Sequence, residues 1–260
     1  MVPVTTERVP KAVADARAEP AEAARPPGLP HRGFTLIELL IVIGIIGLLI
    51  SILVPSLARA HSLALRATCT NNLRQIHLAF GIYAGDHDEK YPCAADPVSA
   101  SPFYWLWMGR GWRGLLSPYL GGKLTADNPL ALFCQADMIA KNKYESTSYA
   151  YSMAFYHSSA QIDAMNSAAQ TYSSPVPSVA QRVQNVAHPA GKVLVAEWTS
   201  NHCRIADDKG WWTWEGERNY LFAGGEVVYL PAARIAPARD GLPDPNLTFG
   251  GIAGQDVAGN

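Results

Sequence analysis

The chain has 260 residues, with 21 basic and 22 acidic side chains and a mean hydropathy of zero. This charge balance excludes a general electrostatic grip on nucleic acid, which requires a basic face. Four cysteines without a C-x-x-C spacing do not make a disulfide scaffold. Charged residues are only 17 % of the chain, against roughly 25 % in soluble domains. A mean hydropathy of zero fits either a uniformly average chain or one strongly apolar segment within a polar remainder, and the order of the residues decides for the second.

The first 33 residues form a segment of their own. They are rich in Ala and Pro, with five basic and four acidic side chains and no apolar period. This composition predicts a disordered or removable targeting segment. A secretory signal has small residues after its apolar stretch, whereas here the small residue Gly33 comes before it. We therefore expect residues 1–33 to be a leader that is cleaved on the cytoplasmic side, while the apolar segment is retained.

Residues 34–57 read FTLIELLIVIGIIGLLISILVPSL and carry one charge, Glu38. As a helix they reach about 36 Å, which is enough to cross an apolar layer of about 30 Å. The alternative is a buried core helix, but core helices are rarely apolar on every face for six turns. Basic residues before the segment predict that its N-terminal side lies in the cytoplasm. Arg59 and Arg66, beyond its other end, weaken the evidence for this orientation.

The run Gly33-Phe34-Thr35-Leu36-Ile37-Glu38, with the apolar stretch after it and Pro55, resembles the signature of type IV prepilins and type II secretion pseudopilins. The resemblance implies that a prepilin peptidase cleaves between Gly33 and Phe34 and methylates the new amino group of Phe34. It also implies a single-pass protein of the inner (cytoplasmic) membrane, with a cytoplasmic N-terminus and a periplasmic or extracellular head. Its partners would be other pilin or pseudopilin subunits, in a homo- or hetero-polymer.

Two residues of this segment are expected to serve assembly. Glu38 is a carboxylate inside a predicted membrane span, where ionisable groups are costly and commonly functional. In the family the matching glutamate pairs with the terminal amine of a neighbouring subunit, and a low-dielectric surrounding strengthens such a pair. The alternative is that Glu38, one turn from Phe34, only extends its carboxylate to the membrane–water interface and has no role in assembly. Pro55 lacks a backbone donor and predicts a kink or a locally melted stretch.

Beyond Pro55 the apolar residues narrow to one stripe. At about 100° per residue they fall within about 80° of the helix circumference. The stripe consists of Leu65, Cys69, Leu73, Ile76, Phe80 and Tyr83. We expect residues 58–86 to continue the helix, to dock by this face on a domain and to end near Gly85. The stripe also makes Cys69 a core residue rather than a reactive thiol.

Residues 87–231 are expected to form a head. A short helix or turn is predicted at 112–120, strands at 147–156 and 192–198, and a hairpin at 219–230 with a primed turn at Gly224–Gly225. Residues 158–173 fit a surface helix or a mobile loop, and residues 232–260 a loose tail. The predicted fold class is α+β and pilin-like, a long helical spine against a small antiparallel sheet.

The head shows a second resemblance, to the large pseudopilin-like proteins of planctomycetes and verrucomicrobia. It is carried by Cys69–Ile76, Tyr83–Pro92, Phe133-Cys134, Ser148-Tyr149, Val193–Glu197 and Leu221–Ala223. Those proteins have a C-terminal motif of His, nine residues and Asp-Gly. The matching positions here are Trp214 and Gly224, followed by Gly225, so no role of that polar pair carries over.

Motifs for catalysis are missing from the sequence, which contains no G-x-S-x-G, H-E-x-x-H, Walker or dinucleotide motif. We therefore expect no enzyme, no cofactor and no metal site. One reservation is calcium, which some pseudopilins bind in a C-terminal loop, here with Asp240, Asp244 and Asp256. The cluster Asp86-His87-Asp88-Glu89 is interpreted as a solvated helix-to-loop junction rather than a cation site.

Tryptophans and cysteines leave two further questions. Trp211, Trp212 and Trp214 could stack on a glycan or a protein, or fill the core of the head. The first reading gives the alternative function of a membrane-anchored binding module, beside the leading hypothesis of a filament subunit. In an exported head, Cys134 and Cys203 could form a disulfide, although sequence does not define connectivity.

Overall fold

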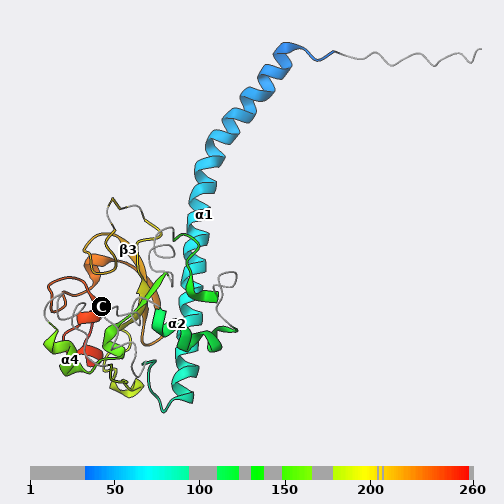
Figure 1. The fold of residues 1–260 in the computed structure, drawn as a ribbon. Coiled ribbons are helices and arrows are strands. Elements are labelled where there is room, and N and C mark those ends of the chain that lie inside the picture. The colour runs from blue at the N-terminus through cyan, green and yellow to red at the C-terminus, as the bar shows by residue number, and fades with distance from the viewer. Residues whose placement is uncertain are drawn as a thin grey trace, which may run out of the picture. The chain divides into compact units, whose positions relative to one another are not determined.

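The computed structural model describes residues 33–93, 110–122, 130–137, 148–165, 178–203, 205–206 and 208–257 (Figure 1). It divides into two units, residues 1–52 and 53–260, which are taken separately below. One helix, α1 (Leu36–Asp86), contributes to both units. The helix is unbroken through Pro55, so the locally melted stretch that the proline suggested does not occur.

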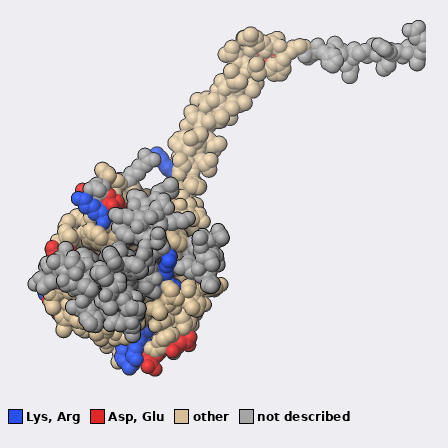
Figure 2. Space-filling view, viewed as in Figure 1, with Lys and Arg blue, Asp and Glu red and all other residues tan. Residues whose placement is uncertain are grey.

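In the first unit, the described residues are Gly33–Thr35 and the N-terminal part of α1. Every one of them is exposed. Among the described residues, α1 is the one helix long and apolar enough to cross a membrane, with a mean hydropathy of 3.0 over its most apolar 18 residues. Figure 2 shows this surface almost free of Lys, Arg, Asp and Glu.

In the second unit, α1 presents one buried stripe. Its buried residues are Cys69, Leu73, Ile76, Ala79, Phe80, Tyr83 and Ala84. The predicted stripe is therefore confirmed, with half-buried Leu65 at its start. Phe80 lies at the centre of an aromatic cluster, 5.0 Å from the Tyr151 ring and 5.8 Å from the Trp112 ring. Burial of these apolar side chains stabilises the contact between this face of the helix and the head.

The head contains a four-stranded antiparallel sheet in the order β1-β2-β3-β4. The strands are β1 (Tyr149–Tyr151), β2 (Val193–Glu197), β3 (Glu217–Phe222) and β4 (Val227–Pro231). Every residue of β2, which lies inside the sheet, and of β1, at its edge, is buried. The expected α+β, pilin-like architecture of a long helix and a small antiparallel sheet is confirmed.

The β3–β4 hairpin forms as predicted, but its turn differs. Gly225 N–H donates to the Phe222 carbonyl at 2.9 Å, and Phe222 N–H donates to the Glu226 carbonyl at 2.8 Å. Gly225 has a φ of +95°, whereas Gly224 does not adopt positive φ. The loop is therefore a three-residue one with a left-handed third position, not a two-residue primed turn. A Cβ on Gly225 would lie 2.7 Å from His77 Nε2 of α1, so this close approach requires glycine.

The described part of the head also contains short helices. The α-helices are α2 (Arg110–Leu116) and α4 (Ser159–Ala164), the latter started by a capping box between Ser158 and Gln161. The 3-10 helices are η1 (Ser117–Leu120), η2 (Leu130–Leu132), η3 (Met153–Phe155), η5 (Val183–Asn185), η6 (Ala232–Arg234), η7 (Pro245–Leu247) and η8 (Gly251–Ala253).

The C-terminal segment differs from the loose tail expected for residues 232–260. Up to residue 257 it packs on the head, with Leu247 fully buried and Ile252 nearly so. A buried ion pair fixes its end, because Lys192 Nζ lies 3.1 Å from Asp256 Oδ2. The same carboxylate accepts a hydrogen bond from Val193 N–H at 2.7 Å. The prediction was wrong because proline and glycine content reports local irregularity, not long-range packing.

Candidate processing and assembly segment

The predicted cleavage site lies directly before α1. Gly33, Phe34 and Thr35 have no helical structure and are exposed, with the Phe34 side chain 74 % exposed. A Cβ on Gly33 would meet no atom within 4 Å. The Gly33–Phe34 peptide bond is thus accessible and outside the hydrogen-bonded helix, which is what a peptidase needs in order to bind an extended segment.

Glu38 has a local role that the sequence reading missed. Its Oε2 accepts hydrogen bonds from Thr35 N–H at 2.9 Å and from the Thr35 hydroxyl at 2.7 Å. Glu38 N–H in turn donates to Thr35 Oγ1 at 3.3 Å. This reciprocal pattern is a capping box, and the spacing Thr-x-x-Glu before an apolar run was the signal for it. Among the described residues, Glu38 Oε1 has no hydrogen-bond partner.

After the cap, the side chains of residues 36–54 expose large apolar groups in all directions. Leu36 is 78 % exposed, Leu48 64 % and Ile52 66 %. A soluble surface rarely carries a continuous apolar patch of this extent. The segment therefore needs lipid or other apolar helices around it.

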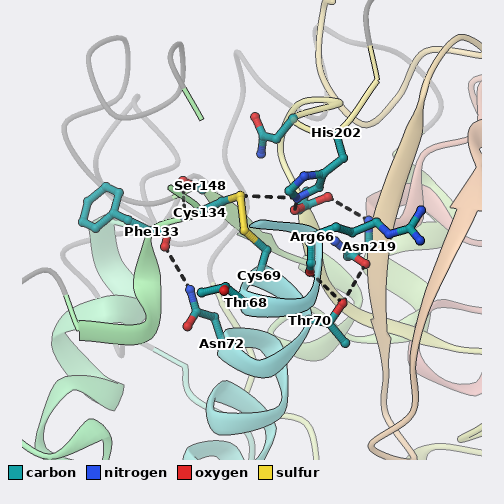
Figure 3. Close-up of a disulfide and its surroundings, with 12 residues drawn as sticks. Arg66, Thr68, Cys69, Thr70, Asn72, Phe133, Cys134, Ser148, His202 and Asn219 are labelled. Atoms are coloured by element: carbon teal, nitrogen blue, oxygen red, sulfur yellow. Dashed lines mark hydrogen bonds and ion pairs between the residues drawn. A yellow bond between two sulfur atoms is a disulfide. The ribbon is translucent and has the colours of Figure 1, made fainter. Parts of the chain in front are cut away.

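The head is attached to α1 by a disulfide that the sequence did not predict (Figure 3). Cys69 and Cys134 are bonded, with Cα atoms 5.2 Å apart, while Cys93 and Cys203 are not in a disulfide. The Cys134–Cys203 disulfide that the sequence left open does not form, because Cys134 is bonded to Cys69. The helix phase does place Cys69 on the buried face, and the segment after η2 brings Cys134 against it.

Polar contacts beside the disulfide tie α1 to the head. Asn72 Nδ2 donates to the Phe133 carbonyl at 2.9 Å, and the Thr70 hydroxyl donates to Asn219 Oδ1 at 3.2 Å (Figure 3). The Arg66 guanidinium lies over the Tyr229 ring, 4.6 Å from its centroid. These contacts come from different sides of α1 within about two turns, so they set the rotation of the helix on the head.

The three tryptophans considered for ligand stacking do not form one exposed face. Trp211 is fully buried, and Trp212 is half-buried, with its ring edge-to-face against Trp198 at 4.7 Å. Trp214 is 43 % exposed. Two of the three rings therefore serve the packing of the head.

The acidic residues considered for calcium have separate local roles. Asp256 pairs with Lys192, Asp244 accepts from Asn246 N–H at 2.9 Å, and Asp240 accepts from Leu242 N–H at 3.0 Å. Asp244 thereby caps η7.

At the 86–89 junction, Asp88 pairs with Lys90 at 3.1 Å, and the His87 ring stacks on Tyr83. Within the described residues, the group of side chains that could hold a metal lies elsewhere: Cys69, Cys134, Glu197 and His202. Sequence spacing gave no signal for this group.

Comparison with known proteins gives one match. Residues 30–54 match the family described as the prokaryotic N-terminal methylation motif, which includes the Gly33–Phe34 bond, Glu38 and most of the exposed apolar segment. No curated protein and no solved structure matches the chain. The chain therefore carries a prepilin-type N-terminal signature and a membrane-capable helix, and the motif supports a protein of the pilin or pseudopilin type.

Proposed function

We propose that this protein is a structural subunit of a type II secretion or type IV pilus-like filament, anchored in the inner membrane until it assembles. A prepilin peptidase removes the leader at Gly33–Phe34 and methylates Phe34, and α1 then packs with the helices of other subunits. The observation that carries the proposal is the coincidence of the methylation motif at 30–54 with an accessible bond and an exposed, charge-poor helix.

Cleavage changes the charge at the start of α1. It creates an amino group on Phe34, four residues before the Glu38 carboxylate. Oε2 of this carboxylate already caps the helix through Thr35, which leaves Oε1 for an amine. In an apolar surrounding a paired carboxylate is far more favourable than an isolated one. An amine from a neighbouring subunit at Oε1 would fix the axial offset between two helices.

Assembly would also keep the apolar segment out of water after it leaves the membrane. The same exposed leucine and isoleucine side chains suit lipid before assembly and neighbouring helices afterwards, because both surroundings exclude water. The head, locked to the second part of α1 by Cys69–Cys134, would be displayed on the filament exterior. Exposure to an oxidising compartment agrees with a disulfide there.

Mass spectrometry of the N-terminus of the protein isolated from membranes tests the proposal. We expect a chain that begins with methylated Phe34. Gly33→Leu should retain the leader, because a branched side chain replaces the small residue at the scissile bond, whereas the matched leader variant Gly28→Leu should be processed normally. A mature protein that still begins at Met1 would exclude the filament function.

A further inference from the structure

Four potential metal ligands meet beside the contact between α1 and the sheet. Cys69 comes from α1, Cys134 from the segment after η2, Glu197 from the end of β2 and His202 from the loop after it. Their ligand atoms all lie within 4.8 Å of one another. The side chains are buried, at 0 % and 2 % exposure for Glu197 and His202. Figure 3 shows the imidazole of His202 directed at the disulfide.

The ligand atoms of these side chains lie at distances close to those in a metal site. His202 Nε2 lies 3.4 Å from Cys134 Sγ and 3.0 Å from Glu197 Oε1. In a tetrahedral zinc site, ligand atoms lie about 3.3 to 3.8 Å apart, given metal–ligand bonds of about 2.0 to 2.3 Å. The nitrogen and oxygen donors are thus close to that spacing already. Two sulfurs, one nitrogen and one oxygen form a donor set that suits zinc and not calcium or magnesium.

Glu197 supports the same interpretation. Its Oε2 accepts a hydrogen bond from Asn219 N–H at 2.8 Å, which orients the carboxylate and leaves Oε1 facing His202. Such an outer hydrogen bond is typical of metal-ligating carboxylates. A fully buried carboxylate is costly unless a cation compensates it. No Lys or Arg among the described residues forms an ion pair with Glu197, and its ion-pair partner is His202, with Nε2 and Oε1 3.0 Å apart. A metal ion bound by both groups would supply the positive charge without a proton on that nitrogen.

We propose that the head binds one zinc ion when the Cys69–Cys134 disulfide is reduced, with Cys69 Sγ, Cys134 Sγ, His202 Nε2 and Glu197 Oε1 as ligands. A phosphine reductant delivers two electrons to the S–S bond and becomes the phosphine oxide by taking the oxygen of one water molecule, whose two protons give the two thiols. A dithiol reductant supplies both the electrons and the protons and becomes a disulfide. On binding, both thiol protons pass to solvent and two Zn–S bonds form. The imidazole carries its proton on Nδ1, which leaves the Nε2 lone pair for the metal. Rotation of the two cysteine side chains separates the sulfurs to about 3.8 Å.

The oxidised and metal-bound states would exclude each other, because a disulfide offers no thiolate. Both states join α1 to the head at the same place, by a covalent bond in one and by coordination in the other. The site thus keeps the helix attached to the head under reducing as well as oxidising conditions. This inference is independent of processing and filament assembly.

The test uses the full chain in detergent, without substitutions at first. Oxidised and phosphine-reduced samples are incubated with excess Zn²⁺ and desalted, and then bound metal and free thiols are quantified. We expect one zinc per reduced chain and none per oxidised chain. Cobalt in place of zinc should give the intense visible absorption of a tetrahedral site and a sulfur-to-metal charge-transfer band. Equal metal content in the two redox states would overturn the proposal.

Variants locate the site. His202→Ala and Glu197→Gln should each weaken zinc binding by the reduced chain at least about tenfold. Cys203→Ser is the matched control, because Cys203 neighbours His202 in sequence but contacts the Glu217 backbone instead of the cluster. It should bind zinc like the wild type. Tryptophan fluorescence of each oxidised variant checks folding. Loss of zinc in Cys203→Ser, or its retention in folded His202→Ala, would place the metal elsewhere and refute the proposal.

Discussion

The two parts of α1 have the same secondary structure and opposite surfaces. From Leu36 to Ile52 the helix is apolar on every face, and every residue is exposed. From Cys69 to Ala84 it is apolar along one stripe, which is buried, and its other faces are exposed or half-buried. The pattern of side chains, not the helical backbone, therefore decides what each part contacts. The first part needs an apolar surrounding supplied from outside the chain, and the second part finds its partner within the chain.

The two parts of α1 differ most in their charged side chains and in their bonds to the head. The first part has a single ionisable side chain, Glu38, held by its own helix cap. The second part is joined to the head by a disulfide and by the Asn72 hydrogen bond, and Arg66, just before it, adds a guanidinium–ring contact. Substitutions in the first part should consequently affect assembly, and those in the second should affect the stability of the head.

The largest effect is expected for Glu38→Ala. This variant should be inserted and cleaved normally but should lose co-assembly completely, because no carboxylate then meets the amine of a neighbouring Phe34. Cross-linking and co-purification with other pilin-type subunits measure the loss. Glu89→Ala, an exposed acidic residue beyond α1, is the matched control and should assemble. Normal incorporation of Glu38→Ala into filaments would contradict the pairing role.

Removal of the disulfide should strongly destabilise the head. The bond closes a loop between residues 65 positions apart, so Cys69→Ala with Cys134→Ala should lower the free energy of unfolding by about 4 kcal/mol. Denaturation in detergent with a chelator present, followed by tryptophan fluorescence, measures it. Cys203→Ala removes a free thiol and should cost less than about 1 kcal/mol. Similar losses in the two variants would show that the disulfide contributes little.

A pair of identical substitutions compares the two parts of α1 directly. Leu73 is fully buried and Leu49 is 61 % exposed. Leu73→Ala should lower the free energy of unfolding of the head by about 3 kcal/mol, because it leaves a cavity, whereas Leu49→Ala should change it by less than about 0.5 kcal/mol. Chemical denaturation of both variants in the same detergent measures the difference. Equal effects would remove the distinction between the two surfaces.

Alkaline pH should weaken the head through its buried tyrosines. Burial raises the pKa of Tyr91 to about 12, so the unfolded chain releases this proton first as pH rises above about 10. The stabilising contribution is complete below pH 10 and is lost as pH rises through 12, with about 1.4 kcal/mol gone by pH 11. Burial lowers the pKa of Lys192, which acts in the opposite direction.

Tyr91→Phe isolates the tyrosine contribution, since Lys192 is unchanged in it. The variant should lose less stability than the wild type between pH 9 and pH 11, by about 1.4 kcal/mol. Denaturation curves at both pH values measure this difference. Identical pH dependence in the two proteins would show that Tyr91 does not titrate with unfolding.

The sequence pattern predicted those features that depend on residues close together in the chain. The period of the stripe placed Leu73, Ile76 and Phe80 in the core, and the apolar runs around Gly224–Gly225 predicted a hairpin. The partner of Cys69 was not predictable, because helix phase says which way a side chain faces but not which distant segment meets it. The same limit applies to His202 and to the Lys192–Asp256 pair.

Composition was the least reliable guide. The tail seemed loose because it is rich in proline and glycine, yet its apolar residues pack and its aspartates cap or pair. The tryptophan cluster left a stacking surface and a core as open alternatives, and the buried Trp211 agrees with the core. Residue type alone does not distinguish a binding surface from a core, because tryptophan serves both.

The smallest expected effect concerns Arg66, where α1 first contacts the sheet. Its guanidinium lies over the Tyr229 ring at a half-buried position, a contact worth about 0.5 to 1 kcal/mol at such sites. Arg66→Ala should lower the free energy of unfolding by that amount, and Arg59→Ala, at an exposed position two turns earlier, should leave it unchanged. Both are measured in the same denaturation series. Equal losses would mean that the positive charge of α1, and not the ring contact, stabilises the head. The part of α1 that its own side chains hold on the head would then begin at Cys69 and not at Arg66.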